Sequence, residues 1–127
     1  MTNILLIEDD PTHRDIIRRI LETQHYAVRA VAGAAEGIAL AIQIQPQVII
    51  LDGGLPEIDG IEATRRLKSH PRTRHIPILL VTAYTDSFDR SAARAVGCDD
   101  YEEKPIEFAS LIRKINQLRA GSLPGAN

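Results

Sequence analysis

Residues 48–52 read Val48-Ile49-Ile50-Leu51-Asp52, a run of branched aliphatic side chains that ends on an acidic residue. Two other runs have the same character, Ile4-Leu5-Leu6-Ile7 and Ile78-Leu79-Leu80-Val81. Runs of this length and composition are typical of strands buried on both faces. The weaker segments 26–31 and 99–102 are further strand candidates, so we expect five strands.

The stretches between these runs have helical patterns. In residues 11–24, Ile16, Ile17, Ile20 and Leu21 share one stripe, and Asp10 stands where an N-cap residue is expected. Residues 34–45, 60–69, 87–96 and 106–118 are the other predicted helices. This alternation predicts an α/β fold: a doubly wound (βα)5 domain with a parallel five-stranded sheet and helices on both faces.

Polar residues follow the predicted strands. In a parallel sheet of this kind, ligands bind beyond the carboxyl ends of the strands. The residues found there are Glu8, Asp9, Asp10, Asp52, Thr82 and Lys104. We therefore expect one edge of the sheet to carry several carboxylates, a hydroxyl and an amine.

Carboxylates held close together repel one another, and a divalent cation relieves that repulsion. Mg²⁺ prefers oxygen ligands and is typically held by one or two carboxylates together with phosphate oxygens. A lysine supplies a point charge for phosphate, and a carboxylate can itself attack phosphorus to form an aspartyl-phosphate. Asp52 lies on the central strand and is the best placed nucleophile, with Lys104 and Thr82 able to contact the phosphoryl oxygens.

The chain resembles a response-regulator receiver domain of the CheY-like family, over residues 3–118. The resemblance is carried by several motifs in family-like order. These are Ile7-Glu8-Asp9-Asp10, Leu51-Asp52-Gly53-Gly54-Leu55-Pro56 with Asp59-Gly60, Val81-Thr82-Ala83, and Gly97-Cys98-Asp99-Asp100-Tyr101 leading to Lys104-Pro105. The resemblance implies the flavodoxin-like strand order 2-1-3-4-5.

The resemblance also implies a metal site. Asp9, Asp52 and the backbone carbonyl of Gly54 would bind Mg²⁺ directly, with Mn²⁺ as an alternative, and Glu8 would hold the ion through water. Asp52 would accept a phosphoryl group from a phosphohistidine on a sensor histidine kinase or a histidine phosphotransfer protein.

The remaining implied roles concern the phosphoryl group and the response to it. Lys104, before a cis Pro105, would bridge to the phosphoryl group. Thr82 would move toward it, and Tyr101 would turn inward as the coupled aromatic switch. The face formed by residues 87–118 would then signal to a downstream protein target. A phosphorylation-dependent homodimer through this face is a further expectation, although the residues near Arg94 depart from the winged-helix subfamily.

Gly53 and Gly54 depart from the family pattern, which often has bulky residues at these two positions. Tyr84, two residues after Thr82, lies on the same predicted rim. We hypothesise that Gly54 and Tyr84 set how long the phosphoryl group survives.

Composition restricts the partners. The net charge is −2, from 15 basic and 17 acidic residues, which argues against direct nucleic-acid binding. No apolar stretch approaches the ~18 residues of a membrane helix. The single cysteine, Cys98, excludes an internal disulfide, so we expect a cytoplasmic protein.

Residues 1–120 are the predicted domain, and residues 121–127 are a predicted flexible tail or linker. We expect a stand-alone receiver, the alternative being a fragment of a larger response regulator or hybrid kinase. The domain would catalyse its own phosphorylation and dephosphorylation without being an enzyme in the usual sense.

Two other functional classes fit the same sheet edge less well. An aspartyl-phosphate phosphatase would carry a second Asp two residues after the first, where this chain has Gly54, and a cap domain. A flavodoxin-like nucleotide module needs a phosphate loop after the first strand. This chain has Glu8-Asp9-Asp10 there, which would repel phosphate.

Overall fold

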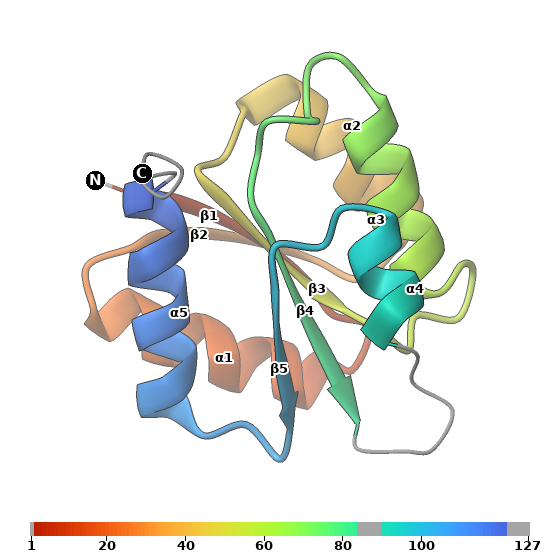
Figure 1. Cartoon of the computed structure of the whole chain (residues 1–127). Coiled ribbons are helices and arrows are strands. Elements are labelled where there is room, and N and C mark those ends of the chain that lie inside the picture. Colours follow the sequence, from red (N-terminus) through yellow and green to blue (C-terminus); the bar gives the residue numbers. More distant parts are fainter. Residues whose placement is uncertain (1, 84–89, 122–127) are drawn as a thin grey trace.

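The computed structural model describes residues 2–83 and 90–121 as alternating strands and helices (Figure 1). The strands are β1 (Asn3–Ile7), β2 (Ala27–Val31), β3 (Val48–Asp52), β4 (Ile78–Ala83) and β5 (Asp100–Lys104). The helices are α1 (Pro11–Thr23), α2 (Ala34–Ile44), α3 (Gly60–Ser69), α4 (Arg90–Ala95) and α5 (Phe108–Gly121). This order confirms the predicted (βα)5 alternation.

The strands form one parallel sheet in the order β2-β1-β3-β4-β5, as expected. Ile7 at the end of β1 pairs with Leu51, and Asp52 at the end of β3 pairs with Val81. The chain leaves β1 toward β2 on one side and leaves β3 toward β4 on the other. The carboxyl ends of β1 and β3 therefore flank the point where a doubly wound sheet forms its binding crevice.

The helices cover both faces of the sheet. α1 and α5 lie on one face, and α2, α3 and α4 lie on the other (Figure 1). The successive aliphatic side chains at 4–7, 48–51 and 78–81 point alternately into these two cores and are almost fully buried. Burial on both sides explains why these strands read as continuous apolar runs. It also holds the strand ends in fixed positions for the site.

The first turns of the helices are stabilised in two different ways. The Asp10 carboxylate accepts hydrogen bonds from the amides of Thr12 and His13, so Asp10 is the N-cap of α1, as expected. Asp59 caps α3 in the same way. The N-cap of α2 is Gly33, which has no side chain to offer. The amides at the start of α2 therefore need an acceptor from elsewhere.

Several predicted boundaries differ from the structure, those of β5 and α5 the most. β5 was predicted over residues 99–102 but spans Asp100–Lys104, because β4 continues to Ala83 and the pairing continues with it. α5 begins at Phe108 rather than at residue 106, because the Glu107 carboxylate accepts the amide of Ser110 and caps the helix. The helix also ends later than residue 118, at Gly121.

The C-terminal half of the predicted α4 is confirmed, since α4 spans Arg90–Ala95. Its predicted start and Tyr84 lie outside the described residues, as do residues 122–127. The domain boundary at residue 120 stays a prediction. No helix in the described part of the chain combines the length and the apolar character that a membrane span requires.

Candidate functional site

The carboxyl ends of four strands surround one cavity of about 680 Å³. β1 leads directly into Glu8, β3 ends on Asp52, β4 contains Thr82, and β5 ends on Lys104. Gly54 and Asp9, from the loops that follow β3 and β1, line the same cavity. The sheet therefore brings together the metal, phosphoacceptor and lysine positions that the sequence predicts.

Glu8, Asp9 and Asp52 form an acidic cluster. One carboxylate oxygen from each residue lies within 4.8 Å of the other two. Glu8 and Asp52 are buried, at 2% and 6% exposure, whereas Asp9 is exposed. Three hard oxygen donors of this kind, open to water on one side, fit a Mg²⁺ ion that keeps part of its hydration shell.

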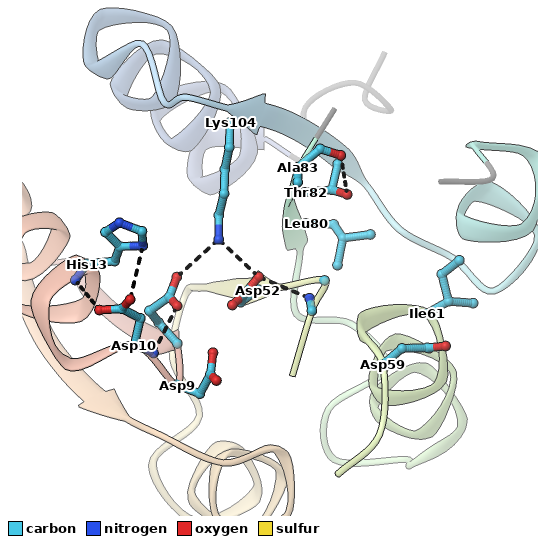
Figure 2. Close-up of a pocket in the computed structure, with 13 residues that line it drawn as sticks. Asp9, Asp10, His13, Asp52, Asp59, Ile61, Leu80, Thr82, Ala83 and Lys104 are labelled. Carbon is cyan, nitrogen blue, oxygen red and sulfur yellow. Dashed lines mark hydrogen bonds and ion pairs between the residues drawn. The ribbon is translucent and has the colours of Figure 1, made fainter. Parts of the chain in front are cut away.

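Lys104 is the cation that faces this cluster. Its Nζ lies 3.3 Å from Asp52 Oδ1 and 3.8 Å from Glu8 Oε1. Figure 2 shows the Lys104 side chain pointing toward Asp52. The Lys104–Pro105 peptide is cis, as the resemblance implied. One positive charge is thus shared by two buried acids, which leaves the cluster with excess negative charge.

The pKa of Glu8 reflects this excess. The pKa of Glu8 is raised to about 7, mainly by burial and in addition by hydrogen bonding to Asp52 and charge repulsion from it. The amide of Asp10 and the charge of Lys104 act in the opposite direction. Asp9, Asp10 and His13 line the same cavity as Glu8, and the Arg14 guanidinium donates to the Glu8 carbonyl oxygen at 2.9 Å. A cation placed in the cluster would favour the charged form of Glu8.

Backbone contacts fix the loop that follows β3. Gly53 donates its amide to Val81 O at 2.7 Å and accepts the Gly60 amide at 3.1 Å. A Cβ on Gly60 would lie 2.6 Å from the Gly53 Cα, so only glycine permits this approach. The Gly54 amide donates to Asp52 Oδ1 at 3.0 Å. These contacts orient the Asp52 carboxylate and keep Gly54 at the edge of the cavity.

The two predicted switch residues lie in different places. Thr82 lines the cavity and is 7% exposed, with its hydroxyl donating to Ala83 O at 3.3 Å. Tyr101 does not line the cavity. Its ring lies between Arg90 of α4 and Lys114 of α5, at 4.8 Å and 5.7 Å from their charged groups. The structure brings Thr82 to the site and leaves Tyr101 outside it.

Two polar residues line the cavity that sequence reasoning left out, His13 and Asp59. His13 lies in the first turn of α1, shortly after the acidic run Glu8-Asp9-Asp10, a signal that the sequence contains. Its imidazole contributes to a weak pair with Asp10, 3.9 Å apart (Figure 2). Asp10 itself acts as a cap, and the amides of His13 and Thr12 hold the pKa of its carboxyl below the usual range.

Comparison with known proteins agrees with this geometry. A family model described as the response regulator receiver domain matches residues 4–116. The chain is 36% identical to the transcriptional regulator RpaA of Synechocystis over 99% of this chain, which spans 53% of RpaA. It is 32% identical to the protein PilH of Pseudomonas aeruginosa, over 95% of this chain and 100% of PilH.

Solved structures show the same similarity. A putative response regulator from Chloroflexus aurantiacus superposes with a TM-score of 0.88 at 31% identity, covering 94% of this chain and 98% of that one. The receiver domain of the sensor histidine kinase PA1611 from Pseudomonas aeruginosa, solved with magnesium in its active-site cleft, gives 0.87 at 31% identity over 94% and 98%. The match over most of the chain, together with the acidic cavity, shows that the chain belongs to the response regulator receiver domain family.

Proposed function

We propose that this receiver domain takes a phosphoryl group on Asp52, using Mg²⁺ held by its own acidic cluster. Receiver domains of two-component systems are phosphorylation-based switches that interact with histidine kinases and downstream effectors. The observation that carries the assignment to Asp52 is its position. It is the buried carboxylate that lies within reach of Lys104, the Gly54 amide and the other two acids together.

The proposed metal ligands are Asp9, Asp52 and the Gly54 carbonyl, with Glu8 acting through water. All belong to or border the cavity described above, and the PA1611 receiver domain is a relative with magnesium in its cleft. Mg²⁺ would supply positive charge for the phosphoryl oxygens. Mn²⁺ has similar ligand preferences and is the expected substitute.

The chemistry that this chain supplies is attack and charge stabilisation. A carboxylate oxygen of Asp52 forms a bond to phosphorus while the bond from phosphorus to the donor nitrogen breaks. The electron pair of that bond leaves with the imidazole of a phosphohistidine on a kinase or phosphotransfer protein. Lys104 balances charge on the transferred group, and the Thr82 hydroxyl turns from Ala83 O to donate to a phosphoryl oxygen.

The downstream response is proposed to pass from Thr82 to Tyr101 and the α4-β5-α5 face. Movement of Thr82 toward the phosphoryl group would leave space behind it for the Tyr101 ring. The surface so changed would contact a protein target or a second copy of the chain. The relatives include both longer proteins and PilH, which the chain matches throughout, so the stand-alone form and cytoplasmic location stay predictions from the sequence.

Intact-mass spectrometry with acetyl phosphate tests the assignment. Wild type should gain one phosphoryl group in the presence of Mg²⁺ and none in EDTA, and Asp52→Asn should gain none. Asp15→Asn, which removes an exposed acid on α1, is the matched control and should behave as wild type. Phosphorylation of Asp52→Asn at the wild-type level would overturn the proposal, and beryllofluoride binding would separate a short-lived product from an unreactive site.

A further inference from the structure

The loop between β3 and α3 makes one charged contact with a different part of the molecule. Oε1 of Glu57 accepts the backbone amide of Ala34, the first residue of α2, at 3.2 Å. The N-cap of α2 is Gly33, which provides no side-chain hydrogen bond. A carboxylate at a helix N-terminus is favoured both by the unpaired amides and by the helix dipole. Glu57 is therefore a cap supplied to α2 from another loop.

The start of α2 is a fixed point for such a contact. Ala34 is fully buried in the core. Gly37, one turn later, packs so closely on β1 that a Cβ there would lie 2.3 Å from the Cδ1 of Ile7. Ile7 directly precedes the acidic pair of the site, and the Glu8 amide is bonded to Val31 O at 3.0 Å. The beginning of α2 is thus held against the strand that delivers Glu8 and Asp9.

The loop that Glu57 belongs to carries the other side of the site. Gly53 anchors its start to β4, and Leu55 is buried in the core. Gly54 is exposed, and its recorded contact is the hydrogen bond to Asp52. Glu57 adds a second attachment, to the start of α2, which packs on β1. Gly54 therefore lies between two attachments of its loop, Gly53 to β4 and Glu57 to α2.

We infer that Glu57 is a positioning residue: by capping α2 it holds the β3–α3 loop where the Gly54 backbone can serve the cation. This inference rests on the proposed Mg²⁺ site and adds a residue that does not touch the ion. The alternative is a purely structural role, in which Glu57 stabilises α2 and nothing else. The positioning role and the purely structural role predict different Mg²⁺ affinities when α2 receives a cap other than Glu57.

The chain allows that separation. A side chain on Gly33 would now lie 3.1 Å from Glu57 Oε1, but the space opens once Glu57 is shortened. Gly33 has extended backbone angles, φ −117° and ψ 154°, that any residue adopts. In the double variant Glu57→Ala/Gly33→Ser, the serine can cap α2 directly while the loop stays untethered. Glu57→Gln keeps an acceptor for the Ala34 amide and removes the charge.

Calorimetric Mg²⁺ titration and urea unfolding of these variants test the inference. Glu57→Ala should weaken Mg²⁺ binding by about tenfold, the range seen when outer contacts of metal sites are lost. In the double variant Glu57→Ala/Gly33→Ser, the urea midpoint should return to the wild-type value while the Mg²⁺ affinity stays low. Glu57→Gln should bind Mg²⁺ with an affinity close to that of wild type. Two results would overturn the inference. One is a Mg²⁺ affinity that returns to the wild-type value together with the urea midpoint in the double variant. The other is an unchanged Mg²⁺ affinity in Glu57→Ala.

A measurement without metal separates this result from the proposed function. Amide hydrogen exchange in EDTA should become faster at Gly54 in Glu57→Ala and stay faster in the double variant. The Ala27 amide, which is bonded to Thr2 O far from the site, is the internal reference. Unchanged exchange at Gly54 would refute the tether even if the wild type bound no Mg²⁺. Failure of the wild type to bind Mg²⁺ would count against the proposed function alone.

Discussion

Two lysine–carboxylate pairs lie at opposite ends of the sheet and differ in how completely the lysine is satisfied. At the amino end, Lys68 Nζ donates to Ile76 O at 2.8 Å and to Arg74 O at 3.3 Å, and lies 2.9 Å from Asp99 Oδ2. The same Asp99 oxygen accepts the Ile78 amide at 2.8 Å. An ammonium group has three donors, so the bonding capacity of Lys68 is filled.

At the carboxyl end, the recorded partners of Lys104 among the described residues are two carboxylates, Asp52 and Glu8. Those distances, 3.3 Å and 3.8 Å, are longer than the Lys68 pair, and the cavity beside them is open. A lysine with donors to spare beside excess negative charge suits a bound ligand. The comparison teaches that a lysine–carboxylate pair can be saturated with partners, as at Lys68, or keep donors available for a ligand, which is the role that we propose for Lys104.

Lys104→Met should show the largest effect. We expect the rate of phosphorylation by acetyl phosphate to fall by about 100-fold, the usual loss when one charge-stabilising group is removed. The free energy of unfolding should change by less than about 1 kcal/mol, because Glu8 can take up a proton when the cation is lost. Phosphorylation time courses by intact mass and urea unfolding measure the two effects. A wild-type phosphorylation rate in Lys104→Met would contradict the proposed functional difference between the Lys104 and Lys68 pairs.

Lys68→Met should show the opposite pattern. Loss of the ion pair and the bonds to two carbonyls should lower the free energy of unfolding by about 2 kcal/mol, since Asp99 is partly exposed and regains water. The phosphorylation rate should match wild type. Arg72→Met, which removes one long bond to Ile42 O on the surface, is the control and should be near neutral. A large loss of phosphorylation at wild-type Mg²⁺ would show that the amino end also serves the site.

The raised pKa of Glu8 gives the carboxyl end its own pH dependence. The folded state holds the Glu8 proton up to about pH 7, whereas the unfolded chain releases it near pH 4.5. The stability that this shift contributes to the metal-free protein should therefore be fully present below pH 4.5 and be lost as pH rises to 7, by on the order of 3 kcal/mol. Glu8→Gln should flatten this slope in urea unfolding series in EDTA. If wild type and Glu8→Gln lost stability with pH at the same rate, the pH dependence could not be assigned to Glu8.

Cys98 reports on the amino end with the smallest effect. Burial raises the pKa of its thiol, which donates to Asp100 O at 2.9 Å. At pH 8 the folded protein should react with a thiol reagent at least about tenfold more slowly than the urea-unfolded chain. Lys68→Met should bring the reaction rate of the folded protein closer to that of the unfolded chain, because it loosens the start of β5. Lys104→Met should leave the ratio of the two rates unchanged. If the ratio of unfolded to folded reaction rates were the same in Lys68→Met and Lys104→Met, Cys98 would not report on the amino end of the sheet.

The sequence predicted correctly those strands whose burial on both faces requires a run of apolar residues. Apolar runs such as Ile4-Leu5-Leu6-Ile7 identified the doubly buried strands, and their order identified the sheet edge where Glu8, Asp52 and Lys104 meet. β5 is less buried and mostly polar, which is why its limits at Asp100 and Lys104 were misplaced. Hydrophobic periodicity carries little information for a half-exposed edge strand.

The contacts that the sequence could not reveal are long-range and polar. Glu57 caps a helix that begins at Ala34, and Lys68 reaches Asp99, although neither pair has a recognisable spacing. Such contacts depend on how loops from different crossovers meet after the sheet has formed. His13 is the intermediate case, because its place in the first turn of a predicted helix was readable but its position on the cavity rim was not.

The close approach of Gly60 to Gly53 also determines which sequence changes this site can tolerate. A Cβ at Gly60 would meet backbone at 2.6 Å, and backbone cannot step aside, whereas a Cβ at Gly54 would have Asp52 Oδ1 as its nearest neighbour at 3.8 Å. In a library that randomises residues 53–60, functional clones should contain varied residues at position 54 and glycine at position 60. Natural variation can thus alter the rim of the site while the base of its loop stays constant.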